Sequence, residues 1–210
     1  MVSSSDEKTG VQALSHIKTS AIKPGQPARK DCEYTRNGTT CLIAAKDICT
    51  GKISAYSQGE TRTESDYLQH VKKIVATKPE AKHVIICDQL NTHKSVSLVT
   101  WIAQTIGDTK DLGKKARYGI LKSQKSRMEY LENKNHRVRF LYTPKHCSWM
   151  NQIENWFGLL QQKVINNGEF ESVNKLENDI ENFIQYYNSY LAKPFNWKFN
   201  GDRYREKFLS

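Results

Sequence analysis

Hydrophobic and polar positions in the first third of the chain follow the pattern of a β-hairpin. The runs TTCLIAA (39–45) and KISAYS (52–57) predict two strands, and DICTG between them predicts the turn. Residues 11–38 are mixed in character and contain Pro24 and Pro27, which indicates irregular backbone. The opening segment MVSSS is expected to be a short, poorly formed first strand. Two or three antiparallel strands are therefore expected here.

Apolar residues recur at helical spacing in four later segments. The predicted helices cover residues 63–76, 95–106, 148–165 and about 173–191. In the third of them, Ser148 is the expected N-cap and Met150 is expected in the apolar stripe.

Two apolar stretches between the predicted helices have the character of strands, at 83–87 and 137–142. The first is apolar almost without interruption, which is typical of a central strand buried on both faces of a sheet. The order of elements therefore predicts an α/β fold, a mixed sheet flanked by helices.

A basic segment at about 107–135 interrupts this order, with some helix expected near 127–132. Contact with DNA phosphates is one interpretation of its charges, and a solvated loop is the alternative. The candidate phosphate-binding residues are Lys114, Lys115, Lys122, Lys125 and Arg127, together with Lys145 further along the chain.

Composition favours a polyanionic partner. Of 210 residues, 32 are Lys or Arg and 22 are Asp or Glu, and the net charge is +10. Nucleic acid is the commonest partner of such proteins, although a basic protein without one is the alternative. An odd count of five cysteines without a C-x-x-C pair indicates reduced thiols in a cytosolic compartment and no zinc site. No apolar run approaches the roughly 18 residues of a membrane helix.

Three carboxylates stand at positions where chemistry is common. Asp88 follows the buried strand 83–87, and ligands of open α/β sheets gather at the carboxyl ends of strands. Asp6 follows the opening segment, and Glu154 borders the apolar stripe of a predicted helix. If the three meet, protonation or cations must offset their repulsion. Oxygen ligands favour Mg²⁺ or Mn²⁺, and two such ions about 3.5–4 Å apart suit phosphodiester cleavage and strand transfer.

Each of these residues also has a structural interpretation. An Asp after a strand commonly caps a turn or helix, and a Glu in a first helical turn favours the helix dipole. His93 is expected to be a hydrogen-bonding loop residue and not a metal ligand. The tryptophans are expected in core or edge packing, namely Trp149, Trp156 and Trp197.

Three motifs together carry a family resemblance: SSSDEKTG, VIICDQLNTH and LYTPKHCSWMNQIENWF, in that order. The chain resembles the catalytic domain of DDE transposases, in the bacterial insertion-sequence branch related to the mariner superfamily. The similarity runs over about residues 5–199 and includes AKPFNWKF near the end. A catalytic domain at 1–199 with a basic insertion at 107–135 is expected, followed by a tail at 200–210.

The resemblance implies a ribonuclease H-like fold and a metal-binding triad of Asp6, Asp88 and Glu154, with Asn91 and His93 shaping the loop beside Asp88. It implies two Mg²⁺ or Mn²⁺ ions, cutting of double-stranded DNA at transposon ends and joining of the 3′ hydroxyl to target DNA. It further implies self-association as a homo-oligomer and a cytoplasmic, nucleoid-associated location.

Three departures from the family pattern accompany the resemblance. The helix-turn-helix region that recognises transposon ends is expected to be absent, because Asp6 lies so near the start. Gln89 follows Asp88 where related sequences commonly have Asn. The interval from Asp88 to Glu154 exceeds the compact mariner spacing, and the segment 107–135 accounts for the excess. The alternative function is a catalytically incomplete remnant that binds DNA or a full-length transposase partner.

Overall fold

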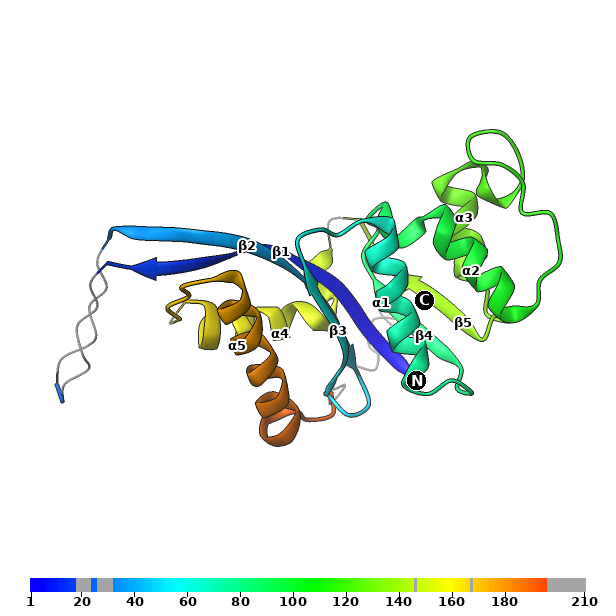
Figure 1. Ribbon diagram of the computed structural model, residues 1–210. Helices are drawn as coiled ribbons and strands as arrows, with labels where there is room; N and C mark the ends of the chain where they lie inside the picture. Colours follow the sequence, from blue (N-terminus) through cyan, green and yellow to red (C-terminus); the bar gives the residue numbers. More distant parts are fainter. Residues whose placement is uncertain (18–23, 26–31, 146, 167, 196–210) are drawn as a thin grey trace, which may run out of the picture.

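A five-stranded sheet forms the centre of the protein in a computed structural model, which describes residues 1–17, 24–25, 32–145, 147–166 and 168–195 (Figure 1). The strand order is β3-β2-β1-β4-β5. The first three strands are antiparallel neighbours, whereas β4 and β5 run parallel to β1. The predicted ribonuclease H-like mixed sheet is confirmed. The strands are β1 (Val2–His16), β2 (Tyr34–Asp47), β3 (Ile53–Gly59), β4 (His83–Cys87) and β5 (Val138–Tyr142).

Helices cover both faces of this sheet, in agreement with the predicted layers (Figure 1). The α-helices are α1 (Glu64–Ala76), α2 (Val96–Ile106), α3 (Gln124–Leu131), α4 (Gln152–Leu160) and α5 (Val173–Tyr186). The last two continue as π-helical turns, Gln161–Ile165 and Tyr187–Leu191, and short 3-10 turns are η1 (Thr92–Lys94), η2 (Ile120–Lys122) and η3 (Ser148–Met150). No helix in the described part of the chain combines the length and apolar character needed to cross a bilayer.

Successive residues of the central strands belong to two different cores, because side chains alternate between the faces of a sheet. In β2, Ile43 packs with α1 and α2, whereas Leu42 and Ala44 pack with α4 and α5. The strand register places Asp6 of β1 opposite Ala44 and Glu7 opposite Ile43. Asp6 therefore lies on the α4 side of the sheet and Glu7 on the α1 side.

The first strand is the main departure from the predicted fold. A short, poorly formed strand was expected, but β1 is 15 residues long and pairs with β2 far beyond the end of β4. The pattern is misleading because Ser3, Ser4 and Ser5 are buried although they are polar. Ser4 forms hydrogen bonds with Asn151 and with the backbone of α4, and these bonds offset the free-energy cost of burying its hydroxyl. The expectation of irregular backbone is wrong for the ends of 11–38 that belong to β1 and β2, and Pro27 lies outside the described residues.

The helix predicted at 148–165 begins later than expected. Residues Ser148–Met150 form a 3-10 turn, and Asn151 breaks the helix with an extended ψ of 117°. Met150 and Trp149 are 54% and 68% exposed, so the predictions of core or edge positions for them are wrong. Trp156 is buried as predicted, and Trp197 lies outside the described residues.

The basic segment is a folded unit and not an open loop. It contains η2 and α3, the helix expected near 127–132, which starts three residues earlier. Leu121 and Leu131 are buried in the same core as α1 and α2. The exposed charged residues of this segment are therefore attached to backbone that is packed against the core.

Candidate active site

Asp6 and Asp88 occupy equivalent places on two adjacent parallel strands. Ser4 of β1 lies opposite Ile86 of β4, and each aspartate follows two residues later. Asp6 is buried and its Oδ1 accepts a hydrogen bond from the Glu7 N–H at 2.9 Å. Asp88 is partly buried and its Oδ1 accepts from the Leu90 N–H, also at 2.9 Å. The pairing of β1 with β4 thus brings two of the predicted triad residues together.

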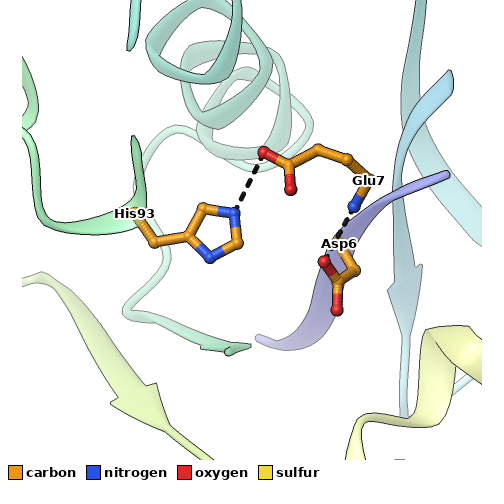
Figure 2. A group of neighbouring side chains, drawn as sticks. All are labelled: Asp6, Glu7 and His93. Carbon is orange, nitrogen blue, oxygen red and sulfur yellow. Dashed lines mark hydrogen bonds and ion pairs between the residues drawn. The ribbon is translucent and has the colours of Figure 1, made fainter. Parts of the chain in front are cut away.

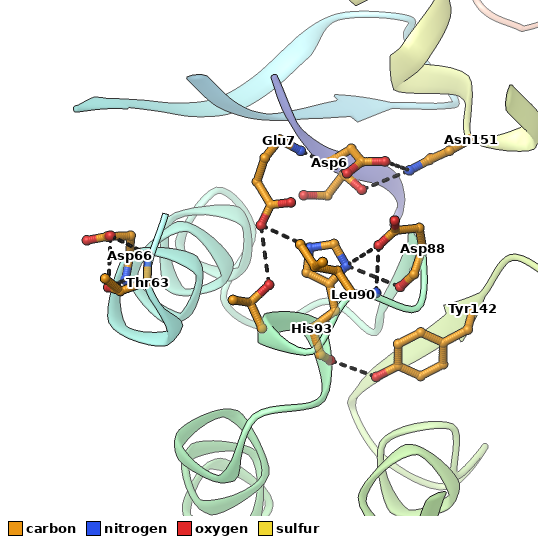
Figure 3. Close-up of polar contacts among 11 residues, drawn as sticks. Asp6, Glu7, Thr63, Asp66, Asp88, Leu90, His93, Tyr142 and Asn151 are labelled. Carbon is orange, nitrogen blue, oxygen red and sulfur yellow. Dashed lines mark hydrogen bonds and ion pairs between the residues drawn. The ribbon is translucent and has the colours of Figure 1, made fainter. Parts of the chain in front are cut away.

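Asn151 fixes the start of α4 against β1 and thereby places Glu154. Its Nδ2 donates to the Ser5 carbonyl at 2.9 Å and to Asp6 Oδ2 at 3.1 Å (Figure 3). Its Oδ1 accepts from the Ser4 hydroxyl, which accepts in turn from the Ile153 N–H at 2.8 Å. Asn151 and Ser4 are both fully buried. Glu154 lies one residue beyond this lock, in the first turn of α4.

Asp88 interacts electrostatically with both Asp6 and Glu154. Burial raises the pKa of Asp6 to about 6, against the Glu7 N–H that lowers it, and the charge of Asp88 raises it further. Burial also raises the pKa of Glu154, where Lys8 acts in the opposite direction and Asp88 adds to the rise. The charge of Asp88 therefore raises the pKa values of both Asp6 on β1 and Glu154 on α4. An all-oxygen set of ligands suits a hard divalent cation, which would offset the repulsion that Asp88 exerts on the other two carboxylates.

His93 lies behind Asp88 and is completely buried. Its Nδ1 lies 2.9 Å from Asp88 Oδ1, and its Nε2 lies 3.2 Å from Glu7 Oε1 (Figures 2 and 3). Burial disfavours the charged ring, but its neighbours Cys87, Asp88 and Glu7 outweigh burial and hold the pKa of His93 well above its usual value. Burial favours neutral Asp88, yet hydrogen bonds from His93 and Leu90 keep the pKa of Asp88 below its usual value.

Sequence reasoning did not single out Glu7, Lys94 or Asn151. A signal for Glu7 exists, since a carboxylate next to Asp6 in a strand must face the opposite layer. The Glu7 side chain is 2% exposed, and one oxygen each of Asp6 and Glu7 lies within 4.8 Å of a His93 ring nitrogen. These three residues form a second candidate metal-binding group. Both His93 nitrogens, however, already face carboxylate oxygens.

Asn91 and η1 connect the Asp88 loop to the basic segment. The Asn91 side chain accepts a hydrogen bond from Gln124 of α3 at 2.7 Å. A cavity of about 420 Å³ opens beside Asp88 between these elements. It is lined by Asp88, Gln89, Leu90, Lys94, Gln124, Thr143, Pro144, Lys145 and Ser148.

Five of the six candidate phosphate-binding residues are exposed, and Arg127 is not. The exposed ones are Lys114, Lys115, Lys122, Lys125 and Lys145. The Arg127 side chain is buried, with Nε donating to the Lys94 carbonyl at 2.6 Å and Nη1 to the Leu121 carbonyl at 2.8 Å. The prediction that Arg127 contacts phosphate is therefore wrong, because its guanidinium donates to backbone carbonyls inside the protein. Lys94, whose pKa is lowered by burial, lines the cavity instead.

Comparison with known proteins identifies a family for this chain. A family model described as DDE superfamily endonuclease matches residues 2–177. No curated protein matches the sequence. Similar solved structures include the Mos1 mariner paired-end complex with Mn, at 15% identity and a TM-score of 0.34, where the match covers 93% of this chain and 56% of that chain. The Mos1 strand transfer complex has 18% identity, a TM-score of 0.35 and the same coverage.

The chain thus spans little more than half the length of those Mos1 chains. The family model, in contrast, matches most of this chain, and the matched residues include Asp6, Asp88 and Glu154. The chain belongs to the DDE superfamily endonucleases.

Proposed function

We propose that this chain is the catalytic domain of a transposase that cleaves DNA and transfers strands with divalent metal ions. The observation that carries the proposal is the placement of Asp6, Asp88 and Glu154. The neighbouring strands β1 and β4 place the two aspartates side by side, Asp6 within β1 and Asp88 directly after β4. The hydrogen bonds of Asn151 hold the first turn of α4, which contains Glu154, against β1. Repulsion from Asp88 raises the pKa of the other two carboxylates in the metal-free protein, and a bound cation would offset this repulsion.

The donor set fits Mg²⁺ or Mn²⁺, and Asp6, Asp88 and Glu154 would hold two such ions. When bound, the ions supply Lewis acidity toward a phosphodiester and lower the pKa of an attacking water. Neighbouring groups orient the two aspartates. Asn151 orients Asp6, while His93 and the Leu90 N–H orient Asp88.

Double-stranded DNA is the proposed substrate, as transposon ends and as target. Support comes from the net charge of +10 and from lysines around the Asp88 cavity, since phosphate contacts supply most of the affinity of such proteins for DNA. Lys94 and Lys145 line that cavity, and the exposed lysines of the basic segment extend the positive surface. Action as a homo-oligomer at the bacterial nucleoid is part of the same proposal.

The test is metal-dependent nicking of supercoiled plasmid by the purified chain and by Asp88→Asn. The Asn side chain keeps the shape but is a poorer ligand for a hard cation. We expect nicking with Mn²⁺ in the parent and its loss in the variant, with DNA affinity retained. Asp47→Asn is the matched control, because Asp47 is a buried carboxylate at the end of β2 whose Oδ1 accepts a hydrogen bond from the Cys49 N–H and is not one of the proposed ligands.

Equal nicking by the parent and Asp88→Asn would contradict the catalytic assignment. A parent that binds DNA but never nicks, even as part of a longer chain, would instead favour a remnant that only binds DNA or a partner.

A further inference from the structure

Glu7 is a buried carboxylate that the proposed chemistry does not use. It follows Asp6 directly, but the alternation of β1 turns it to the α1 side of the sheet, opposite Ile43. Its side chain is 2% exposed. A carboxylate in such a place is costly unless its oxygens are engaged by a polar or charged partner. The nearer of its two side-chain partners is His93, whose Nε2 lies 3.2 Å from Glu7 Oε1 (Figure 2), and the Thr92 hydroxyl donates to the same oxygen at 3.5 Å.

The His93 ring is held on three sides. Its face packs against Tyr67, with ring centroids 4.1 Å apart. Its Nε2 faces Glu7, and its Nδ1 faces Asp88 Oδ1 at 2.9 Å. The two nitrogens of one rigid ring therefore join a carboxylate on β1 to the carboxylate that follows β4. The same Nδ1 also lies 3.1 Å from the Asp88 carbonyl oxygen, so the orientation of the ring and that of Asp88 are expected to change together when Glu7 is altered.

We propose that Glu7 is a positioning residue that fixes Asp88 through His93 and so sets the affinity of the site for a divalent cation. This inference rests on the proposed function, since it takes Asp88 as a metal ligand. Partners that orient a ligating side chain typically change metal affinity by about 10- to 100-fold when they are lost. The Glu7–His93–Asp88 chain has that relation to Asp88 (Figure 3).

A direct metal site formed by Asp6, Glu7 and His93 is the competing interpretation of the same cluster. Ligation by His93 requires a ring nitrogen with a free lone pair aimed at the ion. In the structure each ring nitrogen is directed at a carboxylate oxygen within hydrogen-bond distance. Binding an ion there would break the contact with Glu7. The geometry therefore favours positioning over ligation.

Two substitutions distinguish the effect of the length of the Glu7 side chain from the effect of its charge. Glu7→Gln keeps the length of the side chain and an acceptor oxygen but removes the charge. Glu7→Asp keeps the charge but is one methylene shorter, so its oxygen no longer reaches Nε2. We expect Glu7→Asp to weaken Mn²⁺ binding, measured by calorimetry on the full chain, by about tenfold or more. Glu7→Gln is expected to stay within about threefold of the parent, and Asp47→Asn is the control.

Two further measurements show that the effect passes through His93. In a His93→Gln background, Glu7→Asp is expected to cause no additional loss of Mn²⁺ affinity, because coupled residues are not additive. In the metal-free protein, the ¹⁵N chemical shift of His93 Nε2 is expected to move in Glu7→Asp and to stay near the parent value in Glu7→Gln. The missing signal in His93→Gln assigns the resonance.

Any result in which Glu7→Gln loses as much Mn²⁺ affinity as Glu7→Asp overturns the proposal. So does an unchanged Nε2 shift in Glu7→Asp, and so does the loss of one whole Mn²⁺ equivalent, which would make Glu7 a ligand. The proposed function fails separately: a parent that binds Mn²⁺ but never nicks DNA contradicts only the catalytic role. A parent that binds no Mn²⁺ overturns both.

Discussion

Asn151 Nδ2 lies 3.1 Å from Asp6 Oδ2, a contact between residues 145 positions apart in the sequence. Asn151 stands at the N-cap of α4, yet its side chain does not cap that helix. It bonds to β1 instead, so the start of α4 is fixed by a strand on which a proposed metal ligand lies.

Replacing Asn151 with Ala is expected to destabilise the protein by about 1–3 kcal/mol, the usual penalty for leaving buried polar groups without partners. The groups concerned are the Ser4 hydroxyl, the Ser5 carbonyl and Asp6. Chemical unfolding measures the loss. Asn155→Ala on the exposed face of the same helix is the control and is expected to change little. An Asn151→Ala variant as stable as this control would show that the lock contributes no stability.

Arg127→Ala is expected to lower stability and to leave DNA binding by the folded protein unchanged. Its guanidinium donates to two backbone carbonyls in the interior, and hydrogen bonds to charged groups contribute about 1.5–3 kcal/mol each. The measurements are the melting temperature and the salt dependence of DNA affinity. Lys125→Ala, an exposed neighbour on α3, is expected to show the reverse pattern. A flattened salt dependence in Arg127→Ala would restore a phosphate contact for this residue.

A double substitution of Lys122 and Lys125 by Ala is expected to weaken binding to all duplex sequences alike. Each lost phosphate contact reduces the slope of log affinity against log salt by roughly 0.9. The matched control replaces Lys163 and Lys175, which are exposed beside α4 and on α5. If both double variants change the slope equally, net charge is responsible and the basic segment is no specific DNA surface.

His70 is expected to make the protein sensitive to mild acid. It is completely buried, both ring nitrogens lack hydrogen-bond partners within the described residues, and burial lowers its pKa to about 3, with Lys73 and His93 adding to the effect. Because the unfolded chain binds the proton near pH 6.5 and the folded chain does not, stability is full above pH 6.5 and falls as pH decreases toward 3. At pH 5 the loss is about 2 kcal/mol.

His70→Leu is expected to remove this component of acid sensitivity. The difference in unfolding free energy between pH 7.5 and pH 5 is the quantity to compare in parent and variant, because it cancels the effect of packing. An equal difference in both proteins would show that His70 is not responsible.

Most of the fold could be predicted because its elements bury apolar stripes. The hairpin of β2 and β3, the strand β4 and the helices α1, α2 and α5 all follow simple periodicity. The first strand does not, because Ser3, Ser4 and Ser5 are buried by virtue of small size and hydrogen bonds. The hydrophobic pattern does not reveal hydrogen-bond partners that are distant in the sequence, such as Asn151 for Ser4.

The candidate site divides in a similar way. Asp6, Asp88 and Glu154 could be selected from motifs. The pairing of β1 with β4 brings the two aspartates together, whereas Glu154 comes from α4. Arg127 was misplaced because charge in a sequence does not reveal whether a side chain faces solvent or backbone carbonyls. Glu7 and Lys94 were missed because their roles arise from the layer they face, which requires the register of β1 and the position of η1.

Because side chains of β1 alternate between the two faces of the sheet, the length of the segment before Asp6 is constrained. Deleting one residue between Met1 and Asp6, with the strand ends held in place, would exchange the faces of the two acidic residues. Glu7 would then take the place of Asp6 beside Asn151, and Lys8 would take the place of Glu7 beside His93. Loss of a residue pair would preserve the faces but shorten the pairing with β4. The segment is therefore expected to tolerate substitutions far better than changes in length.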